Sequence, residues 1–171
     1  MEKKKIFVVE DESIVSLEIQ SRLKSLGYSV CGHAASGDEA IRKVLDLKPD
    51  LILMDIRIKG DMDGIETAAQ IRKHLDIPVI FLTAYADETT LNRAKITDPF
   101  GYIIKPFEER DLQINIEIAL YKDLTQKLLR EKDKWLSAIL TSVGDAVIAT
   151  DTSGRIKFIN NVAERLTGYT K

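Results

Sequence analysis

Five side chains that suit metal and phosphoryl chemistry stand at the ends of short apolar runs in this sequence. They are three carboxylates, one hydroxyl and one ammonium: Glu10, Asp11, Asp55, Thr83 and Lys105. Asp55 is the most informative, because it follows an uninterrupted apolar run at residues 51–54. Such a run is typical of a strand buried on both faces, where a carboxylate is costly unless it has partners. Asp55 therefore needs partners from other parts of the chain.

The types of these side chains indicate which chemistry they could perform together. Crowded carboxylates repel and would raise one another's pKa unless a cation lay among them. Mg²⁺ prefers carboxylate oxygens and keeps several waters that another oxygen-rich ligand can replace. Lys105 would add a point charge and Thr83 a hydroxyl donor, and both suit phosphoryl oxygens that the metal does not cover. The set predicts a site for Mg²⁺ and a phosphoryl group.

The elements that must position these side chains alternate along the chain. Strand-like apolar runs cover residues 6–9, 28–34, 51–54, 78–83 and 101–105. Segments with helical spacing cover residues 14–26, 38–47, 63–75 and 87–95, and a long helix follows Pro106. Asp63 can cap the third of these helices.

This alternation predicts an α/β fold with a doubly wound five-stranded parallel sheet, because parallel strands need crossover helices. Ligands of such sheets bind outside the carboxyl ends of the strands. The five reactive side chains stand at those ends, so we expect them to meet at one edge of the sheet.

Composition narrows the class of protein. The chain has 171 residues, of which 44% are hydrophobic and 30% charged, as in globular proteins. Its net charge of −2 gives no electrostatic indication of nucleic acid or a membrane surface. The single cysteine, Cys31, excludes an internal disulfide framework. No apolar run approaches the roughly 20 residues that cross a bilayer, and no signal peptide is visible, so a cytoplasmic location is expected.

Four motifs, in this order, resemble the response-regulator receiver domain of two-component signalling across residues 4–122. They are VVEDE with its acidic pair, LILMD ending in Asp55, FLTA containing Thr83, and YIIKPF containing Lys105 and Pro106. The resemblance implies a flavodoxin-like strand order 2-1-3-4-5, here with a C-terminal helical extension. It also implies a cis peptide bond between Lys105 and Pro106.

The resemblance assigns a role to each motif residue. Asp55 would be the nucleophile that accepts a phosphoryl group from a phosphohistidine donor. Glu10 and Asp11 would hold Mg²⁺ together with Asp55, and the backbone carbonyl of Arg57 would complete the metal site. The receiver would thereby promote its own phosphorylation and dephosphorylation.

The phosphoryl oxygens would be contacted by Thr83 and Lys105. Tyr102, three residues before Lys105, stands where the family carries an aromatic switch that responds to Thr83; the alternative is ordinary packing in a strand. Two further residues, Arg57 and Tyr85, lie two positions beyond Asp55 and Thr83, where the family tunes the lifetime of the phosphorylated state.

One loop departs from the family pattern. Alternative interpretations of single motifs have less support than the receiver resemblance. The stretch DIRIKGDMDG lacks the proline common in the family and is one residue longer. A haloacid-dehalogenase-type phosphatase would need a second acid where Arg57 stands. The DMDG at residues 61–64 hints at a calcium loop but lacks the other ligands, so turn chemistry is favoured. His33 and His74 have no matching ligands nearby and are expected to be ordinary surface or strand-edge residues.

The last third of the chain carries two further patterns. Positions with four-three spacing indicate a coiled-coil seam, weakened by two polar members; they are Ile114, Ile118, Tyr121, Thr125, Leu128, Lys132, Trp135 and Ile139. The alternative is one long surface helix.

From residue 141 the stretches DAVIATD, GRIKFIN and AERLTGY resemble the opening of a PAS sensor domain, with a turn at residues 152–154. About thirty residues are present, whereas a whole PAS domain has about a hundred.

These patterns predict a receiver domain at residues 1–122, a linker helix at 123–140 and the N-terminal fragment of a PAS domain at 141–171. The expected partners are a histidine kinase or phosphotransfer protein and a second copy bound through the helix, without nucleic acid or a membrane segment. The expected function is a phosphoacceptor that signals through its helix to a PAS or output region of a hybrid sensor kinase or multidomain regulator. The alternative is a phosphate relay or sink without its own output.

Overall fold

The computed structural model describes residues 3–84, 99–142 and 144–169. The helix predicted at residues 87–95 and the predicted role of Tyr85 fall outside these residues. Contacts divide the chain into two compact units, Met1–Leu124 and Thr125–Lys171.

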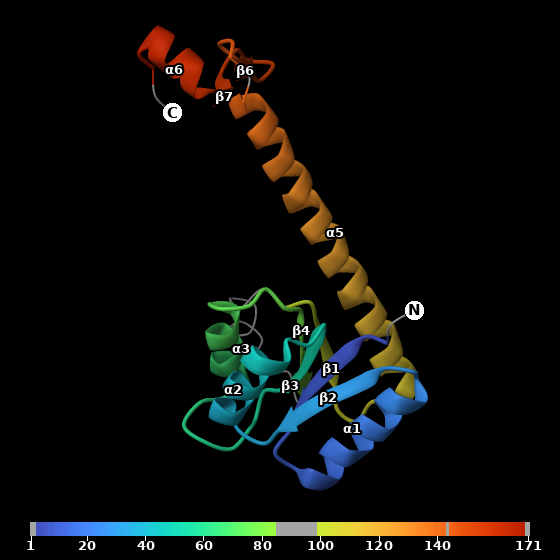
Figure 1. The fold of residues 1–171 in the computed structure, drawn as a ribbon. Coiled ribbons are helices and arrows are strands. Elements are labelled where there is room, and N and C mark those ends of the chain that lie inside the picture. The colour runs from blue at the N-terminus through green and yellow to red at the C-terminus, as the bar shows by residue number, and fades with distance from the viewer. Residues whose placement is uncertain (1–2, 85–98, 143, 170–171) are drawn as a thin grey trace. The chain divides into compact units, whose positions relative to one another are not determined.

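The first unit is built on a parallel sheet (Figure 1). Its strands are β1 (Lys5–Val9), β2 (Ser29–Ala34), β3 (Leu51–Asp55), β4 (Val79–Thr83) and β5 (Gly101–Ile104). They are ordered β2-β1-β3-β4-β5, and every neighbouring pair is parallel. The predicted fold class and strand order are confirmed.

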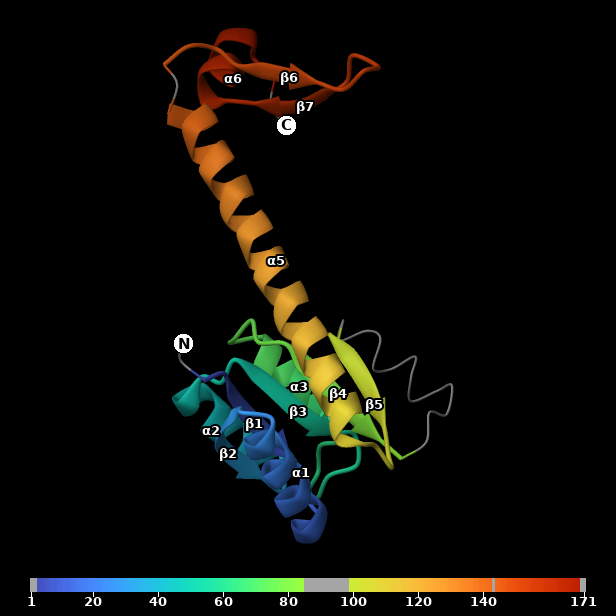
Figure 2. The ribbon, with the colours of Figure 1, turned by 90° about the vertical axis from the view of Figure 1, so that its right-hand side faces the viewer.

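Helices cover both faces of this sheet (Figure 2). They are α1 (Ser13–Ser25), α2 (Gly37–Leu47), α3 (Gly64–Arg72) and the first turns of α5 (Glu109–Ser142). Successive strand residues point to opposite faces, so Phe7 and Val9 pack with α2 and α3 whereas Ile6 and Val8 pack with α1 and α5. Burial on both faces explains why the central strands are apolar without interruption.

The start of α3 is stabilised by the residue predicted to cap it. The Asp63 carboxylate accepts a hydrogen bond from the Glu66 backbone N–H at 2.9 Å, and the Glu66 carboxylate accepts one from the Asp63 N–H at 3.1 Å. This reciprocal capping box satisfies two N–H groups that the helix itself leaves unpaired. Asp63 thus serves as a helix cap, in agreement with the turn chemistry expected of the DMDG stretch.

Helix α5 buries only its first turns against the sheet. Leu112, Ile116 and Ala119 are fully buried, whereas Tyr121 and Trp135 are 73% and 68% exposed. Among the described residues, no helix combines the length and apolar character needed to span a membrane.

The second unit contains a short antiparallel hairpin followed by a helix. Strands β6 (Ile148–Thr150) and β7 (Ile156–Ile159) pair with each other, and α6 (Asn161–Thr167) follows. Asn160 is buried and uses its whole side-chain amide. Its oxygen accepts hydrogen bonds from the Val147 and Ala163 N–H groups, and its nitrogen donates to the carbonyls of Leu140 and Asp145. This one side chain therefore joins the end of α5 to the hairpin and to α6.

Candidate functional site

The parallel register brings the reactive side chains to one edge of the sheet. Asp55 is the last residue of β3 and Thr83 the last of β4, while Glu10 and Lys105 directly follow β1 and β5. Val9 is paired with Met54 and Asp55 with Leu82, so the strands end at nearly the same level. The site predicted from the strand ends is thus assembled at the carboxyl edge.

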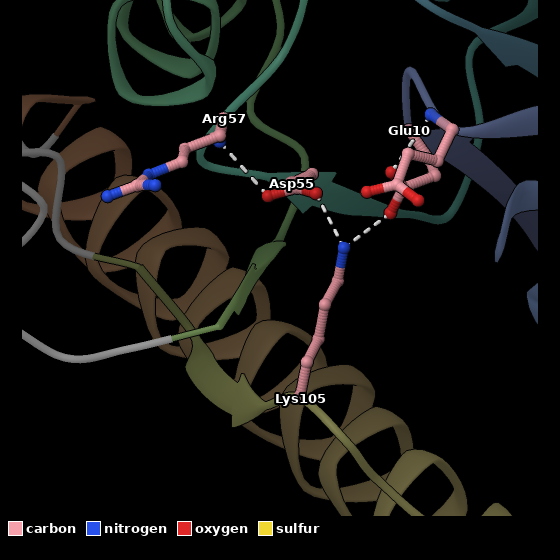
Figure 3. Close-up of polar contacts among 5 residues, drawn as sticks. Glu10, Asp55, Arg57 and Lys105 are labelled. Carbon is pink, nitrogen blue, oxygen red and sulfur yellow. Dashed lines mark hydrogen bonds and ion pairs between the residues drawn. The ribbon is translucent and has the colours of Figure 1, made fainter.

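Lys105 joins two of the carboxylates (Figure 3). Its Nζ donates to Glu10 Oε2 at 2.6 Å and to Asp55 Oδ2 at 2.5 Å. Both carboxyl residues are buried, with exposed fractions of 2% for Glu10 and 7% for Asp55. Charge-assisted hydrogen bonds of this kind offset the cost of burying a carboxylate. Lys105 is therefore a partner of the kind that a carboxylate buried at the end of β3 needs.

Burial and these contacts shift two pKa values in the site. Burial raises the pKa of Glu10 above its usual 4.5 and the charge of Asp55 adds to this, although the contact with Lys105 opposes it. Burial by itself would lower the pKa of Lys105, but its contacts with Asp55 and Glu10 prevail and raise it above 10.5. Lys105 consequently stays protonated at neutral pH and can act as a fixed positive charge.

Three carboxylates could hold a metal ion. Glu10, Asp11 and Asp55 each offer an oxygen, and these oxygens lie within 4.8 Å of one another. A cluster of carboxylates suits a hard divalent cation, and a set of carboxylate oxygens without sulfur or nitrogen fits Mg²⁺. Neither His33 nor His74 belongs to this group.

The role predicted for the Arg57 carbonyl stays a prediction. The structure shows a contact of the other backbone polar group of this residue, because the Arg57 N–H donates to Asp55 Oδ1 at 3.0 Å (Figure 3). Asp55 therefore has one oxygen facing Lys105 and the other held by the backbone. This arrangement orients the carboxylate within the site.

An open cavity gives solvent access to this carboxylate. It is walled by the loop between β3 and α3 and by the ends of the strands; its lining includes Asp11, Glu12, Asp55, Arg57, Asp61, Thr83 and Lys105. A small anionic substrate could thus approach Asp55 from outside the sheet edge, with Thr83 and Lys105 on the cavity wall.

Tyr102 lies in β5 with its ring turned toward the core. The ring packs against Phe81 at a centroid separation of 6.0 Å, and it contacts the core cluster beneath α2 and α3. Its hydroxyl is buried and has no hydrogen-bond partner among the described residues. Thr83 is 4% exposed at the end of the neighbouring strand. The peptide bond between Lys105 and Pro106 is cis.

Two structural features of the site were not recognised in the sequence. Gly64 begins α3 so close to β3 that a Cβ there would lie 1.9 Å from the Asp55 carbonyl oxygen. Lys59, in the longer loop, places its Nζ 3.9 Å from Asp11 Oδ2. The available signals were the glycine after a capping aspartate and the lysine four residues after Asp55, but neither signal is specific alone.

The fold and the site together define a flavodoxin-like α/β domain with an acidic, lysine-containing pocket at the carboxyl edge of its sheet. The family model of the response regulator receiver domain matches residues 6–117. The chain belongs to this family, and its first unit is a receiver domain of two-component signalling.

Individual proteins agree with this assignment. The transcriptional regulatory protein PdtaR of Mycobacterium tuberculosis is 31% identical over 124 residues, which cover 71% of this chain and 60% of PdtaR. The chain thus spans less than two thirds of that relative.

Two solved structures match almost over their full length. The signal receiver domain of a modulated diguanylate cyclase from Desulfovibrio desulfuricans is 38% identical with a TM-score of 0.70, covering 73% of this chain and 99% of that one. The N-terminal domain of a response regulator/sensory box/GGDEF three-domain protein from Carboxydothermus hydrogenoformans is 34% identical with a TM-score of 0.66, covering 72% and 98%.

Proposed function

We propose that the receiver unit accepts a phosphoryl group on Asp55 from a phosphohistidine donor. An Asp55 oxygen attacks phosphorus, a new phosphorus–oxygen bond forms, and the phosphorus–nitrogen bond to the donor breaks with the electron pair returning to the imidazole. The observation that carries this proposal is the Asp55 carboxylate, which opens to the cavity and belongs to the group of carboxylates that could hold a metal. The product is an acyl phosphate.

The surrounding residues supply electrostatic stabilisation for this transfer. Lys105 stays protonated and already contacts Asp55, so it can follow a phosphoryl oxygen as negative charge is transferred. Thr83, on the cavity wall, can donate its hydroxyl to a second oxygen. Mg²⁺ held by Glu10, Asp11 and Asp55 would neutralise charge on the phosphoryl group. The same residues would assist attack by water, so the unit would also promote its own dephosphorylation.

The proposed output passes along α5 into the second unit. After α5, this unit has the strand, turn, strand and helix order expected for the opening of a PAS domain, and Asn160 joins these elements to the end of α5. The Carboxydothermus protein combines a response regulator with a sensory box, which supports a similar order here. We therefore favour a multidomain regulator or hybrid sensor kinase over a phosphate sink.

A second copy of the chain is the partner proposed for α5. Exposed apolar residues follow the four-three spacing and are flanked by further leucines; the exposed set includes Ile118, Tyr121, Leu124, Leu128, Leu129, Trp135, Leu136 and Ile139. In a parallel pair this spacing places Glu117 beside Lys122 of the second copy, and Lys132 beside its Glu131. These opposite charges favour a parallel dimer and offset the polar seam position at Lys132.

The decisive test of the phosphoacceptor is labelling with acetyl phosphate and Mg²⁺. The wild type should acquire an acid-stable, base-labile phosphate, and Asp55→Asn should abolish it because the amide that replaces the carboxylate is a poor nucleophile. Asp61→Asn, which alters another carboxylate lining the same cavity, is the matched control and should keep the label. A base-labile phosphate of unchanged yield in Asp55→Asn would refute the proposal.

A further inference from the structure

Lys59 is held beside the acidic cluster by its backbone. It lies in the loop between β3 and α3, four residues after Asp55. Its main chain forms an isolated parallel bridge with Ser36, which immediately precedes α2. The farther end of the loop is also tied down, because the Gly64 N–H donates to the Ile56 carbonyl at 2.9 Å. The Lys59 backbone is thus held between Ile58 and Gly60, which both line the cavity, and the Lys59 side chain is largely exposed to solvent.

That side chain reaches the carboxylate that Lys105 does not contact. Lys59 Nζ lies 3.9 Å from Asp11 Oδ2 and 3.5 Å from the Asp11 carbonyl oxygen. Lys105 contacts Glu10 and Asp55. The two lysines therefore divide the three carboxylates between them, and each candidate metal ligand has an ammonium group nearby.

The two lysines differ in how easily they could leave. The Lys105 side chain is 20% exposed and makes two short contacts, whereas the Lys59 side chain is 73% exposed and makes two long ones. An ammonium at the surface can return to water at little cost, because exposed ion pairs contribute little stability. Lys59 can thus pair with Asp11 in the absence of a metal and leave when one binds.

We propose that the Lys59 ammonium competes with Mg²⁺ for Asp11 and so lowers the affinity of the receiver site for the metal. The ammonium and the metal require the same carboxylate, so binding must first break the pair. After the pair breaks, the loop backbone still keeps the Lys59 side chain near the site, so its charge continues to repel the bound cation. This inference rests on the proposed function, because it concerns the metal of that same site.

The test is titration of the full chain with MgCl₂ by isothermal calorimetry at low ionic strength, without a phosphodonor. Lys59→Met keeps the aliphatic stem and removes the charge, and it should bind Mg²⁺ about two- to fivefold more tightly than the wild type. Lys59→Glu should bind more tightly still. Lys59→Arg should retain the wild-type affinity, as should Lys73→Ala, which removes a lysine at the opposite end of α3.

The salt dependence of the Mg²⁺ affinity provides a second measurement, because a purely structural effect of the substitution would not depend on salt. The gain in Lys59→Met should shrink as KCl is raised, because salt screens exposed charges. Wild-type affinity in Lys59→Met and Lys59→Glu, or a gain independent of salt, would overturn the inference. Labelling of the wild type with acetyl phosphate tests the phosphoacceptor role of Asp55 separately. A missing label would contradict the proposed function, whereas an unchanged Mg²⁺ affinity in the Lys59 variants would contradict only the competition.

Discussion

At the scale of single residues, the protonation of a buried carboxylate depends on burial and on the nearby lysine. Glu10 is the clearest case, because burial raises its pKa while Lys105 opposes the rise. Between pH 4.5 and this raised pKa the folded chain binds more protons than the unfolded chain, so this one group makes the free energy of unfolding increase as pH falls through that window.

Removal of the Lys105 charge should therefore raise the pKa of Glu10 further. In Lys105→Met the ammonium that favours the ionised carboxylate is gone while burial remains, so Glu10 should retain its proton to higher pH. The side-chain carbon shift of Glu10, followed by NMR against pH in metal-free protein, measures this directly. Lys43→Met, at a lysine paired with Glu39 on α2, is the control and should leave the Glu10 curve unchanged. A lower pKa in Lys105→Met would contradict the assigned interaction.

Thr83 and Tyr102 allow a test of the switch at the same scale. If phosphorylation draws the Thr83 hydroxyl toward the phosphoryl group, the space beside Tyr102 changes and its ring can move. Thr83→Ala should still accept phosphate on Asp55 but lose the response at Tyr102, whereas Thr83→Ser should retain it. The measurement is the change in ring chemical shifts on adding beryllofluoride. An equal Tyr102 response in the Ala variant would remove Thr83 from the switch.

At the scale of elements, the contact between the end of β3 and the start of α3 sets the position of Asp55. A Cβ at Gly64 would lie 1.9 Å from the Asp55 carbonyl oxygen and 3.0 Å from the Ile56 Cα. These are backbone atoms, so α3 or β3 would have to move. Gly64→Ala should therefore destabilise the chain by roughly 1–3 kcal/mol, the usual cost of overpacking.

Urea unfolding of Gly64→Ala provides the measurement, and labelling of Asp55 should slow in parallel because its carboxylate is displaced. Gly144→Ala is the matched control, since among the described residues no atom beyond its chain neighbours lies within 4 Å of the added Cβ. Wild-type stability in Gly64→Ala would show that the two elements are not in tight contact.

At the scale of the whole molecule, the receiver and the C-terminal unit differ in how much of their apolar surface is covered. The first unit buries its central strands β1, β3 and β4 on both faces, whereas Ile148 and Ile156 of the short hairpin are 46% and 48% exposed. An exposed apolar hairpin and an exposed apolar helix face both favour association with another chain.

Light scattering should accordingly find a dimer for the full chain and a monomer after truncation at Lys122. The truncated chain keeps the buried turns of α5, including Leu112, Ile116 and Ala119, so the sheet stays covered and Asp55 should still accept phosphate. Leu128→Glu in the full chain is a point variant that should weaken the dimer without shortening the helix. A monomeric full chain, or a truncated chain that dimerises equally well, would exclude α5 as the interface.

The sequence by itself determined the fold class, the strand order expected from the family resemblance, and the sheet edge at which the reactive residues meet. It could do so because strand burial, helical spacing and the Asp63 cap are local patterns, repeated along the chain and readable without knowledge of distant residues. The identities of Asp55, Thr83 and Lys105 as strand-end residues followed from the same patterns. The PAS and dimer assignments remain predictions.

Only the tertiary structure decided which side chains pair within the site. The contact of Lys105 with Glu10 and Asp55 joins residues 95 and 50 positions apart, and the approach of Lys59 to Asp11 spans 48. Such pairs depend on strand register and on the path of a loop, which many distant contacts set together. The fit of Gly64 against β3 depends likewise on how closely two elements pack, and no local pattern in the sequence encodes that distance.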